Sequence, residues 1–319
     1  MNILISGGAG FIGSHLTAAL LRDPQVRSLI VYDNISSGSR RHVAAAGSDP
    51  RLTLVEGDLK DLPQLSNAMK EVDAVFHLAA NPDIAKAVTQ PDIDFWEGTY
   101  LTQNVLEAMR TNKARKILYT SGSGVYGDAP GVAFPETYGP CIPISTYGAS
   151  KLACEGLIAA YCHMFGMRGR AFRFANVVGP RQTHGVGYDF IRRLRADPSK
   201  LRILGDGTQC KSYIHVDDVL AAILMELATI NSPPAFDVLN AATDDYITVT
   251  EIADIACAAC GLDPTRVQYD YSGGNRGWKG DVPKVLFDVS KIKARGWKAA
   301  RSSRQAMEAS LEAMLNELI

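Results

Sequence analysis

Short, continuous runs of apolar residues alternate with stretches of helical spacing along the first half of the chain. A continuous apolar run indicates a strand buried on both faces, and such strands are typical of parallel sheets covered by helices. The pattern predicts strands at residues 2–6, 28–33, 52–58, 73–80, 115–122 and 168–179. It predicts helices at residues 13–23, 61–70, 94–112 and 147–165. The expected fold class is α/β, with a doubly wound parallel sheet.

The pattern changes after residue 177. Residues 178–212 are rich in Gly and Arg, and a strand-like start followed by a helix returns at 213–229. We therefore expect a larger domain formed by residues 1–177 and 213–244. Residues 178–212 and 245–319 would form a smaller C-terminal lobe at the carboxyl ends of the strands, where such folds bind ligands.

A glycine-rich stretch, Gly8-Ala9-Gly10-Phe11-Ile12-Gly13, joins the first predicted strand to the first predicted helix. It fits the pattern G-x-G-x-x-G in the strand–turn–helix context that gives this pattern its meaning. Glycines there allow a tight turn and let a pyrophosphate approach the amides at the start of the helix. The stretch therefore predicts a Rossmann-type dinucleotide site, with Gly7, Gly10, Phe11, Ile12 and Gly13 as candidate residues.

An acidic residue about 20 positions after the glycine stretch supports this prediction. Asp33 ends the second predicted strand, where a carboxylate binds ribose hydroxyls and repels a 2′-phosphate, so NAD is favoured over NADP. Taken alone, Asp33 could be a turn residue. Asp58, at the end of the third strand, is a candidate acceptor for the adenine amino group. The other candidate NAD-binding residues are Asn34, Ser37, Gly38, Leu59, Leu78, Ala79 and Ala80.

Tyr147 and Lys151 are four residues apart in a predicted helix and therefore share one face. A phenol ordinarily loses its proton at about pH 10, and a nearby ammonium favours the phenolate. Such a tyrosine can act as a general base near neutral pH. The same spacing is common on helix surfaces, so the prediction of a catalytic pair that also contacts the cofactor depends on the glycine stretch upstream.

The motifs together resemble the extended short-chain dehydrogenase/reductase superfamily. They are the glycine stretch, "HLAA" at 77–80, "VYGD" at 125–128, Tyr147-x-x-x-Lys151 and "RFANVVGPR" at 173–181. Within it the chain is most similar to the NAD-dependent nucleotide-sugar epimerase/dehydratase family. "LGDGTQCKSYIHVDD" at 204–218 and "RGWKGDV" at 276–282 resemble its UDP-glucose (galactose) 4-epimerase-like branch.

This resemblance implies epimerisation at C4 of a nucleotide-diphosphate sugar through a transient 4-keto sugar. The larger domain would hold NAD, and the smaller lobe would hold the nucleotide sugar. Tyr147 would take the proton from the 4-OH, and Lys151 would hold the nicotinamide ribose. The resemblance also implies substrate-binding residues: Asn176, Lys211, Arg276 and Asp281, with Tyr188, Phe190 and His184 as residues that line the nucleotide pocket.

Two positions depart from the family pattern. The Ser or Thr four residues before the Tyr of "VYG" is Gly122 here, so that Ser121, Ser123 or a water would have to supply its hydroxyl; we favour Ser123. Losing one such hydrogen bond lowers the rate roughly 100-fold or more. The asparagine of the family pattern N-V-x-G-T reads as Gly98, which leaves the local geometry open.

The segment between Thr120 and Tyr126 contains no carboxylate, whereas dehydratases of the family carry one there. This favours epimerisation over 4,6-dehydration. A dehydratase, a 4-keto-reductase and a non-catalytic dinucleotide-binding protein remain alternatives.

Composition excludes several other classes of function. The net charge of −1 gives no basic surface for nucleic acid, and no apolar run is long enough to span a membrane. No secretory signal is evident, and six scattered cysteines fit a reducing, cytoplasmic compartment. Cys257 and Cys260 form a C-x-x-C within a predicted helix, without the further ligands that a metal site needs. The family usually dimerises through two helices, here 94–112 and 147–165. Their candidate interface residues are Phe95, Leu101, Val105, Leu157, Ile158 and Tyr161.

Overall fold

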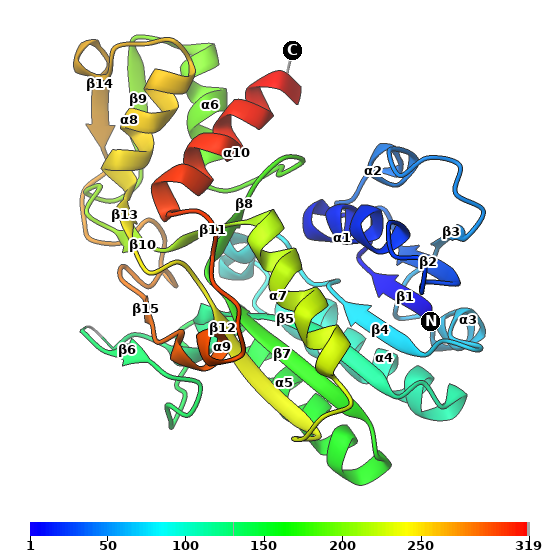
Figure 1. Ribbon diagram of the computed structural model, residues 1–319. Helices are drawn as coiled ribbons and strands as arrows, with labels where there is room; N and C mark the ends of the chain where they lie inside the picture. The colour runs from blue at the N-terminus through cyan, green and yellow to red at the C-terminus, as the bar shows by residue number, and fades with distance from the viewer. Residues whose placement is uncertain (130, 318–319) are drawn as a thin grey trace. The chain divides into compact units, whose positions relative to one another are not determined.

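A computed structural model describes residues 1–129 and 131–317 (Figure 1). Its seven-stranded sheet has the order β12–β7–β5–β4–β1–β2–β3. The strands are β1 (Asn2–Ser6), β2 (Ser28–Asp33), β3 (Leu52–Glu56), β4 (Ala74–His77), β5 (Lys116–Gly122), β7 (Arg168–Phe174) and β12 (Phe236–Ala241). The chain starts at β1 in the interior of the sheet, runs outward to β3, and then returns to β4 on the other side of β1. The pairs β1–β2, β2–β3, β1–β4 and β4–β5 are parallel, and the predicted doubly wound α/β fold is confirmed.

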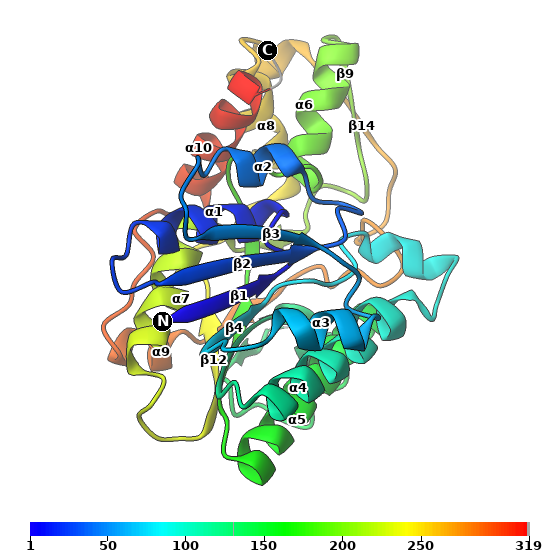
Figure 2. The same cartoon turned by 90° about the vertical axis from the view of Figure 1, so that its right-hand side faces the viewer.

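Helices cover both faces of this sheet (Figure 2). α1 (Phe11–Leu21) and α7 (Val216–Thr229) lie on one face, and α3 (Leu62–Ala68), α4 (Tyr100–Asn112) and α5 (Thr146–Phe165) lie on the other. A short helix, α2 (Arg40–Ala44), follows β2. Leu4, Val75 and Ile117 of the strands pack in one buried cluster with Val105 of α4 and Ile158 of α5. The continuous apolar runs of the strands are therefore explained by burial between two layers of helices.

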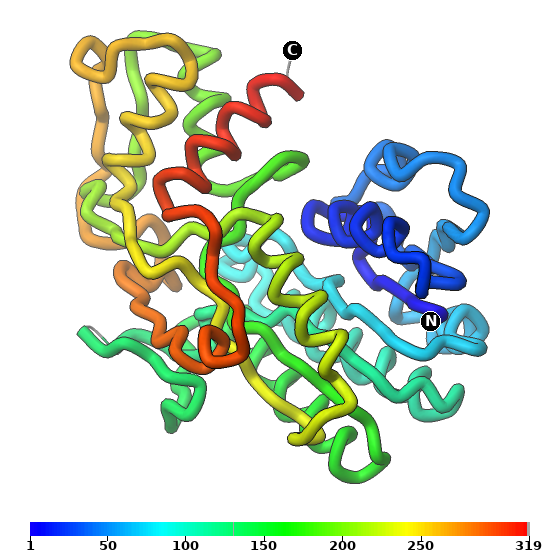
Figure 3. The backbone as a smooth tube through the Cα atoms, in the orientation of Figure 1, coloured from blue at the N-terminus to red at the C-terminus, as the bar shows by residue number. Residues whose placement is uncertain are grey.

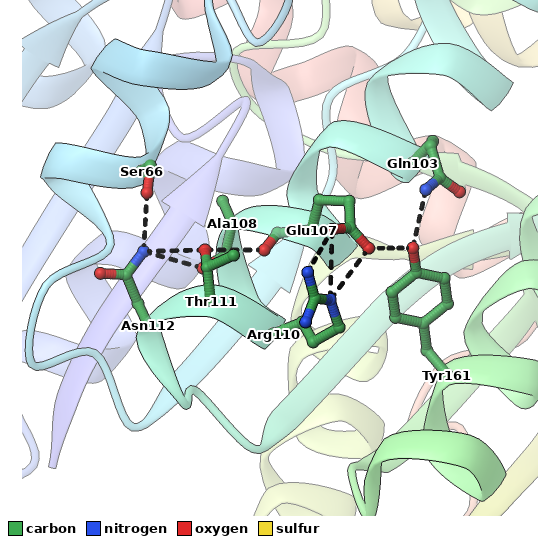
Figure 4. Close-up of polar contacts among 8 residues, drawn as sticks. All are labelled: Ser66, Gln103, Glu107, Ala108, Arg110, Thr111, Asn112 and Tyr161. Carbon is green, nitrogen blue, oxygen red and sulfur yellow. Dashed lines mark hydrogen bonds and ion pairs between the residues drawn. The ribbon is translucent and has the colours of Figure 1, made fainter.

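Polar contacts join α4 to its neighbouring helices (Figure 4). Gln103 donates a hydrogen bond of 2.7 Å to the hydroxyl of Tyr161 on α5, and this hydroxyl donates to Glu107. Asn112 donates a hydrogen bond of 2.9 Å to Ser66 on α3. The contacts of Tyr161 fix α5 against α4 at the end of α5 that is distant from Tyr147, and the Asn112 contact fixes α3 against α4.

Two predicted elements are interrupted. The strand predicted at 168–179 is two strands, because the chain leaves the large sheet at Ala175 and β8 (Asn176–Val178) pairs instead with β11 (Tyr213–His215). The helix predicted at 94–112 starts as a π-helical turn, η2 (Phe95–Thr99), before α4. Such turns insert an extra residue in a helix and are frequent at functional sites.

The chain forms two compact units. The first comprises Met1–Val125, Ser145–Arg173 and Leu220–Leu239, and the second comprises Tyr126–Ile144, Phe174–Val219 and Asn240–Ile319. In the second unit, α6 (Val186–Ala196), α8 (Val249–Ala259) and α10 (Ser303–Glu317) pack side by side around an apolar cluster (Figure 3).

The remaining elements of the described chain are short. The strands are β6 (Ala133–Phe134), β9 (Lys200–Ile203), β10 (Cys210–Lys211), β13 (Ile247–Thr248), β14 (Gln268–Tyr271) and β15 (Leu286–Phe287). The helical turns are α9 (Ser290–Ala294), η1 (Ile84–Val88), η3 (Ser123–Tyr126) and η4 (Pro264–Arg266). Among the described residues no helix is both long and apolar enough to cross a membrane.

Candidate active site

The glycine-rich stretch forms a tight turn between β1 and α1. Gly7 has a φ of +73°, which favours glycine, and its carbonyl accepts a hydrogen bond of 3.2 Å from the amide of Gly10. A Cβ at Gly13 would lie 2.3 Å from the Gly7 oxygen, so only glycine fits there. Gly10 is the N-cap of α1 and has no side-chain cap, so the amides of Phe11 and Ile12 at the start of the helix can bind an anion.

The carboxylate of Asp33 lies beside this turn. Its Oδ2 accepts a hydrogen bond of 2.9 Å from the amide of Ala9, and its Oδ1 accepts one of 2.8 Å from the amide of Ile35. Each oxygen keeps a lone pair that a ribose hydroxyl can use. Gly38 also approaches the turn, since a Cβ there would lie 2.8 Å from the carbonyl carbon of Ala9. The same loop carries two further predicted residues, Asn34 and Ser37.

The predicted residues after β4 lie against the glycine turn. The amides of Leu78 and Ala79 donate hydrogen bonds of 3.0 and 3.1 Å to the carbonyl of Ser6, and Ala80 follows them. A Cβ at Gly7 would lie 2.7 Å from the Ala79 nitrogen. The reversal of strand order between β1 and β4 is thus the point where the cofactor candidates gather, as expected for a ligand site in this fold.

Asp58 and Leu59 follow β3. The carboxylate of Asp58 accepts a hydrogen bond of 2.9 Å from the amide of Lys60. The side chain of Leu59 is buried, and its carbonyl accepts a hydrogen bond of 2.9 Å from Asn104 on α4. These contacts fix the backbone at Asp58 and Leu59, which the sequence predicts to bind the cofactor.

Tyr147 and Lys151 lie on the first turns of α5, which Ser145 caps by accepting a hydrogen bond of 3.1 Å from the amide of Gly148. The Lys151 side chain is buried, and its Nζ donates a hydrogen bond of 2.7 Å to the carbonyl of Thr120 at the end of β5. The same nitrogen lies 5.5 Å from the ring centroid of Tyr147. The arrangement places a fixed positive charge beside a half-buried phenol.

His77 is a buried group near this lysine that the sequence analysis did not single out. Its Nδ1 contacts the hydroxyl of Ser6 at 2.7 Å, and its Nε2 contacts the hydroxyl of Thr102 at 3.0 Å. Burial, together with the nearby charge of Lys151, lowers the pKa of His77 from 6.5 to about 3. The imidazole is therefore neutral near pH 7, and Lys151 supplies the positive charge at this position.

The structure separates the two serines that flank Gly122. The Ser121 hydroxyl donates a hydrogen bond of 2.6 Å to Glu155, whose other oxygen forms a buried ion pair of 2.7 Å with Arg173. The hydroxyl of Ser123 has no hydrogen-bond partner among the described residues. Glu155 was missed by the sequence analysis, although its position four residues after Lys151 places it on the same helix face.

Ser150 explains the glycine at position 98. A Cβ at Gly98 would lie 2.4 Å from the Ser150 Oγ, so the serine occupies the space that a larger side chain would need. The Ser150 hydroxyl donates a hydrogen bond of 2.7 Å to the carbonyl of Asp94 and contacts the Thr99 hydroxyl at 2.9 Å. The π-helical turn is therefore anchored directly to the helix that carries Tyr147 and Lys151.

In the second unit, three of the predicted substrate-binding residues form one network. The ammonium of Lys211 pairs with the carboxylate of Asp281, which also accepts a hydrogen bond of 3.0 Å from the amide of Gly277. Arg276 donates to the carbonyl of Asp281 and pairs with Asp128. Asp281 is buried and holds both cations, through its carboxylate and its carbonyl.

The other predicted residues of this unit are more dispersed. Asn176 is exposed at the start of β8, and His184 is exposed in the loop before α6. Tyr188 is half-buried, with the guanidinium carbon of Arg192 lying 5.8 Å from its ring centroid. Phe190 is only 2% exposed in the apolar cluster of α6, α8 and α10, which favours a packing role for it.

All six cysteines are free thiols, and Cys257 of the C-x-x-C is buried in α8. In the part of the chain that the structure describes, no three His, Cys, Asp or Glu side chains are placed to share a metal ion.

Comparison with known proteins relates this geometry to a family. Residues 3–242 match the profile of the NAD dependent epimerase/dehydratase family. UDP-glucose 4-epimerase of Lacticaseibacillus casei is 30% identical over 319 residues, which are 93% of this chain and 92% of that protein. dTDP-glucose 4,6-dehydratase of Actinoplanes sp. is 30% identical over 298 residues, which are 91% of this chain and 92% of that protein.

Solved structures agree with this relation. A crystal structure of UDP-galactose 4-epimerase is similar over 100% of both chains, with a TM-score of 0.88 and 38% sequence identity. The family is NAD-dependent, so the predicted cofactor is confirmed. The comparisons include both epimerases and a dehydratase, and they place the chain among enzymes related to nucleotide-sugar 4-epimerases. This chain belongs to the NAD dependent epimerase/dehydratase family.

Proposed function

We propose that this protein is an NAD-dependent 4-epimerase that interconverts UDP-glucose and UDP-galactose or closely related UDP-sugars. The observation that carries the proposal is the placement of Lys151, whose buried ammonium is held by the Thr120 carbonyl beside the ring of Tyr147. The names of the related epimerases support UDP as the nucleotide.

In this proposal Tyr147 moves a proton and Lys151 stabilises the charge that this creates. The Tyr147 oxygen accepts the proton of the sugar 4-OH and returns it at the end of the cycle. The fixed ammonium of Lys151 stabilises negative charge on that oxygen. His77 is neutral near pH 7 and adds no second positive charge. The glycine turn and Asp33 would hold NAD, and a bound NAD would supply reversible hydride transfer at C4 to either face of the 4-keto sugar.

The two serines have different roles. We propose that Ser123 supplies the hydroxyl that Gly122 lacks, since the Ser121 hydroxyl is already bound to Glu155. A Cβ at Gly122 would meet no heavy atom within 4 Å apart from its chain neighbours, so the space in front of Gly122 is open. A hydroxyl donor that contacts the sugar O4 would stabilise charge during proton transfer.

The cations of the second unit are proposed to bind the diphosphate. Lys211 and Arg276 offer donors that suit phosphate oxygens, and Asp281 and Asp128 hold these side chains in place. Asn176 would contact the nucleotide sugar near its phosphates, and Tyr188 would line the nucleotide pocket. In this proposal Asp281 contributes to substrate binding by orienting Lys211 and Arg276, and not only by contacting a sugar hydroxyl.

The same residues favour epimerisation over dehydration. Expelling water from the sugar needs an additional acid and base, and the segment between Thr120 and Tyr126 has no carboxylate. The carboxylate that lies behind this segment, Glu155, is bound to Ser121 and ion-paired with Arg173. It is therefore occupied by structural contacts.

Product analysis tests the proposal. Purified protein mixed with UDP-glucose, without added NAD, is expected to give UDP-galactose and the reverse reaction from UDP-galactose. A 4-keto product that absorbs in alkali would indicate a dehydratase instead. Bound NAD without any conversion of either sugar would support a non-catalytic, dinucleotide-binding protein.

A further inference from the structure

Asp94 is a buried acid outside the proposed catalytic pair. It immediately precedes η2, and only 2% of the residue is exposed. Among the described residues it forms no ion pair with a Lys, Arg or His side chain. A buried carboxylate without a cation is destabilising unless hydrogen bonds compensate for its lost hydration. Its partners should therefore explain why an acid occupies this position.

Each carboxylate oxygen of Asp94 binds a different segment of the first unit. Oδ1 accepts a hydrogen bond of 2.9 Å from the side-chain amide of Asn81. Oδ2 accepts one of 2.7 Å from the hydroxyl of Thr146, the first residue of α5. The carboxylate thus lies close to the N-terminus of a helix, where a negative charge is stabilised by the helix dipole.

The two segments carry different parts of the proposed site. Asn81 directly follows Ala80, at the end of the candidate cofactor segment that packs on the glycine turn. Thr146 directly precedes Tyr147. Asn81 is itself held in place, since its amide oxygen accepts a hydrogen bond of 3.0 Å from the amide of Asp83. Asp94 is therefore a direct link between the loop after β4 and the start of α5.

We propose that Asp94 is a positioning residue, which fixes Tyr147 relative to the bound nicotinamide by joining Asn81 to Thr146. This inference rests on the proposed function, because it assigns Tyr147 to proton transfer. The proton leaves the 4-OH oxygen and the hydride leaves the carbon that carries it, C4. Tyr147 and the nicotinamide must therefore both be in position at the same time. Misplacing a reacting group by about 1 Å lowers a rate roughly 100-fold.

Three variants test this link through its separate contacts. Thr146→Val removes only the hydroxyl on the α5 side, and Thr146→Ser keeps it. Asp94→Asn keeps the size of the side chain but leaves one oxygen to accept two donors. Thr146→Val and Asp94→Asn are expected to lower kcat for UDP-glucose about 10-fold or more. KM and the amount of bound NAD should stay within about 2-fold of wild type, and Thr146→Ser should restore most of kcat.

Thr111→Val is the matched control. Thr111 is also an exposed threonine of the first unit, and its hydroxyl donates a hydrogen bond of 2.9 Å to the carbonyl of Glu107 on α4 (Figure 4). This variant should keep wild-type kcat. A Thr146→Val protein with wild-type kcat would overturn the proposal. So would a loss of kcat fully accounted for by lost NAD or by unfolded protein.

Hydrogen–deuterium exchange tests the link without using activity. Asp94→Asn is expected to raise amide exchange both at residues 78–83 and at residues 145–150, and Thr111→Val is expected to raise it at neither. Unchanged exchange at both segments in Asp94→Asn would overturn the link. If the wild-type protein converts no UDP-sugar while this paired increase is seen, the proposed function fails and the link between the two segments stands.

Discussion

At the scale of single residues, the two serines beside Gly122 should respond differently to loss of the hydroxyl. Ser123→Ala is expected to lower kcat roughly 100-fold with little change in melting temperature, because it removes the donor that we propose contacts the sugar O4. Ser121→Ala should lower the melting temperature more, because it leaves the buried Glu155 short of a donor. Steady-state kinetics and thermal unfolding of both variants give the comparison. A larger loss of kcat in Ser121→Ala would reverse the assignment.

His77 gives a prediction for the dependence of stability on pH. Burial, together with the charge of Lys151, lowers its pKa in the folded state from 6.5 to about 3, so below pH 6.5 the unfolded chain takes up a proton that the folded protein does not. Acid therefore favours unfolding, and the stabilisation present above pH 6.5 is lost progressively towards pH 3. Between about pH 7 and about pH 5 the wild type should lose about 2 kcal/mol more than His77→Asn. Urea unfolding measures this, and equal losses in both proteins would contradict it.

At the scale of elements, replacing either of two helical glycines by alanine is expected to have opposite effects. Gly13→Ala places a Cβ 2.3 Å from the Gly7 oxygen and should abolish retention of NAD during purification. Gly156→Ala in α5 meets no heavy atom within 4 Å and should stabilise the helix by about 1 kcal/mol with NAD retained. The 260 nm absorbance of the released nucleotide and the melting temperature check both. Full NAD content in Gly13→Ala would contradict the role of the turn.

The strands could be predicted because continuous apolar runs report burial on both faces, which is a local signal. The break at Ala175 could not be predicted, because it depends on the pairing of β8 with β11, which lies nearly forty residues later in the chain. The π-helical turn depends on Ser150, which fills the space beside Gly98 from another helix. The ion pair of Arg173 with Glu155 and the contacts of Asp94 could not be predicted either, because their partners are distant in the sequence. Motifs located the site, but its supporting contacts join residues that only the fold brings together.

At the scale of the whole molecule, we propose a homodimer formed through two helical segments, η2 with α4 and α5. Leu101, Val105 and Ile158 are buried in the core of the first unit, so they are not free to form an interface. Phe95 is 51% exposed and Met164 of α5 is 72% exposed. A dimer that uses these helices would cover such side chains.

Sedimentation velocity checks the dimer. The wild type is expected to sediment with twice the chain mass of 34.4 kDa. Met164→Glu should shift it towards the monomer, because a charge would be buried in the interface. Ile142→Glu changes a similarly exposed apolar residue outside these helices and serves as the control. A monomeric wild type, or a Met164→Glu protein that stays dimeric, would contradict the proposal.

The central claim is that a resident NAD takes and returns the hydride at C4 while Tyr147 moves the proton. The most direct measurement follows UDP-glucose deuterated at C4 through conversion by the purified protein, with no NAD added. The account predicts UDP-galactose that keeps its deuterium at C4, and a Tyr147→Phe protein that retains NAD but forms no product. Loss of the deuterium to solvent, or wild-type turnover by Tyr147→Phe, would contradict the account.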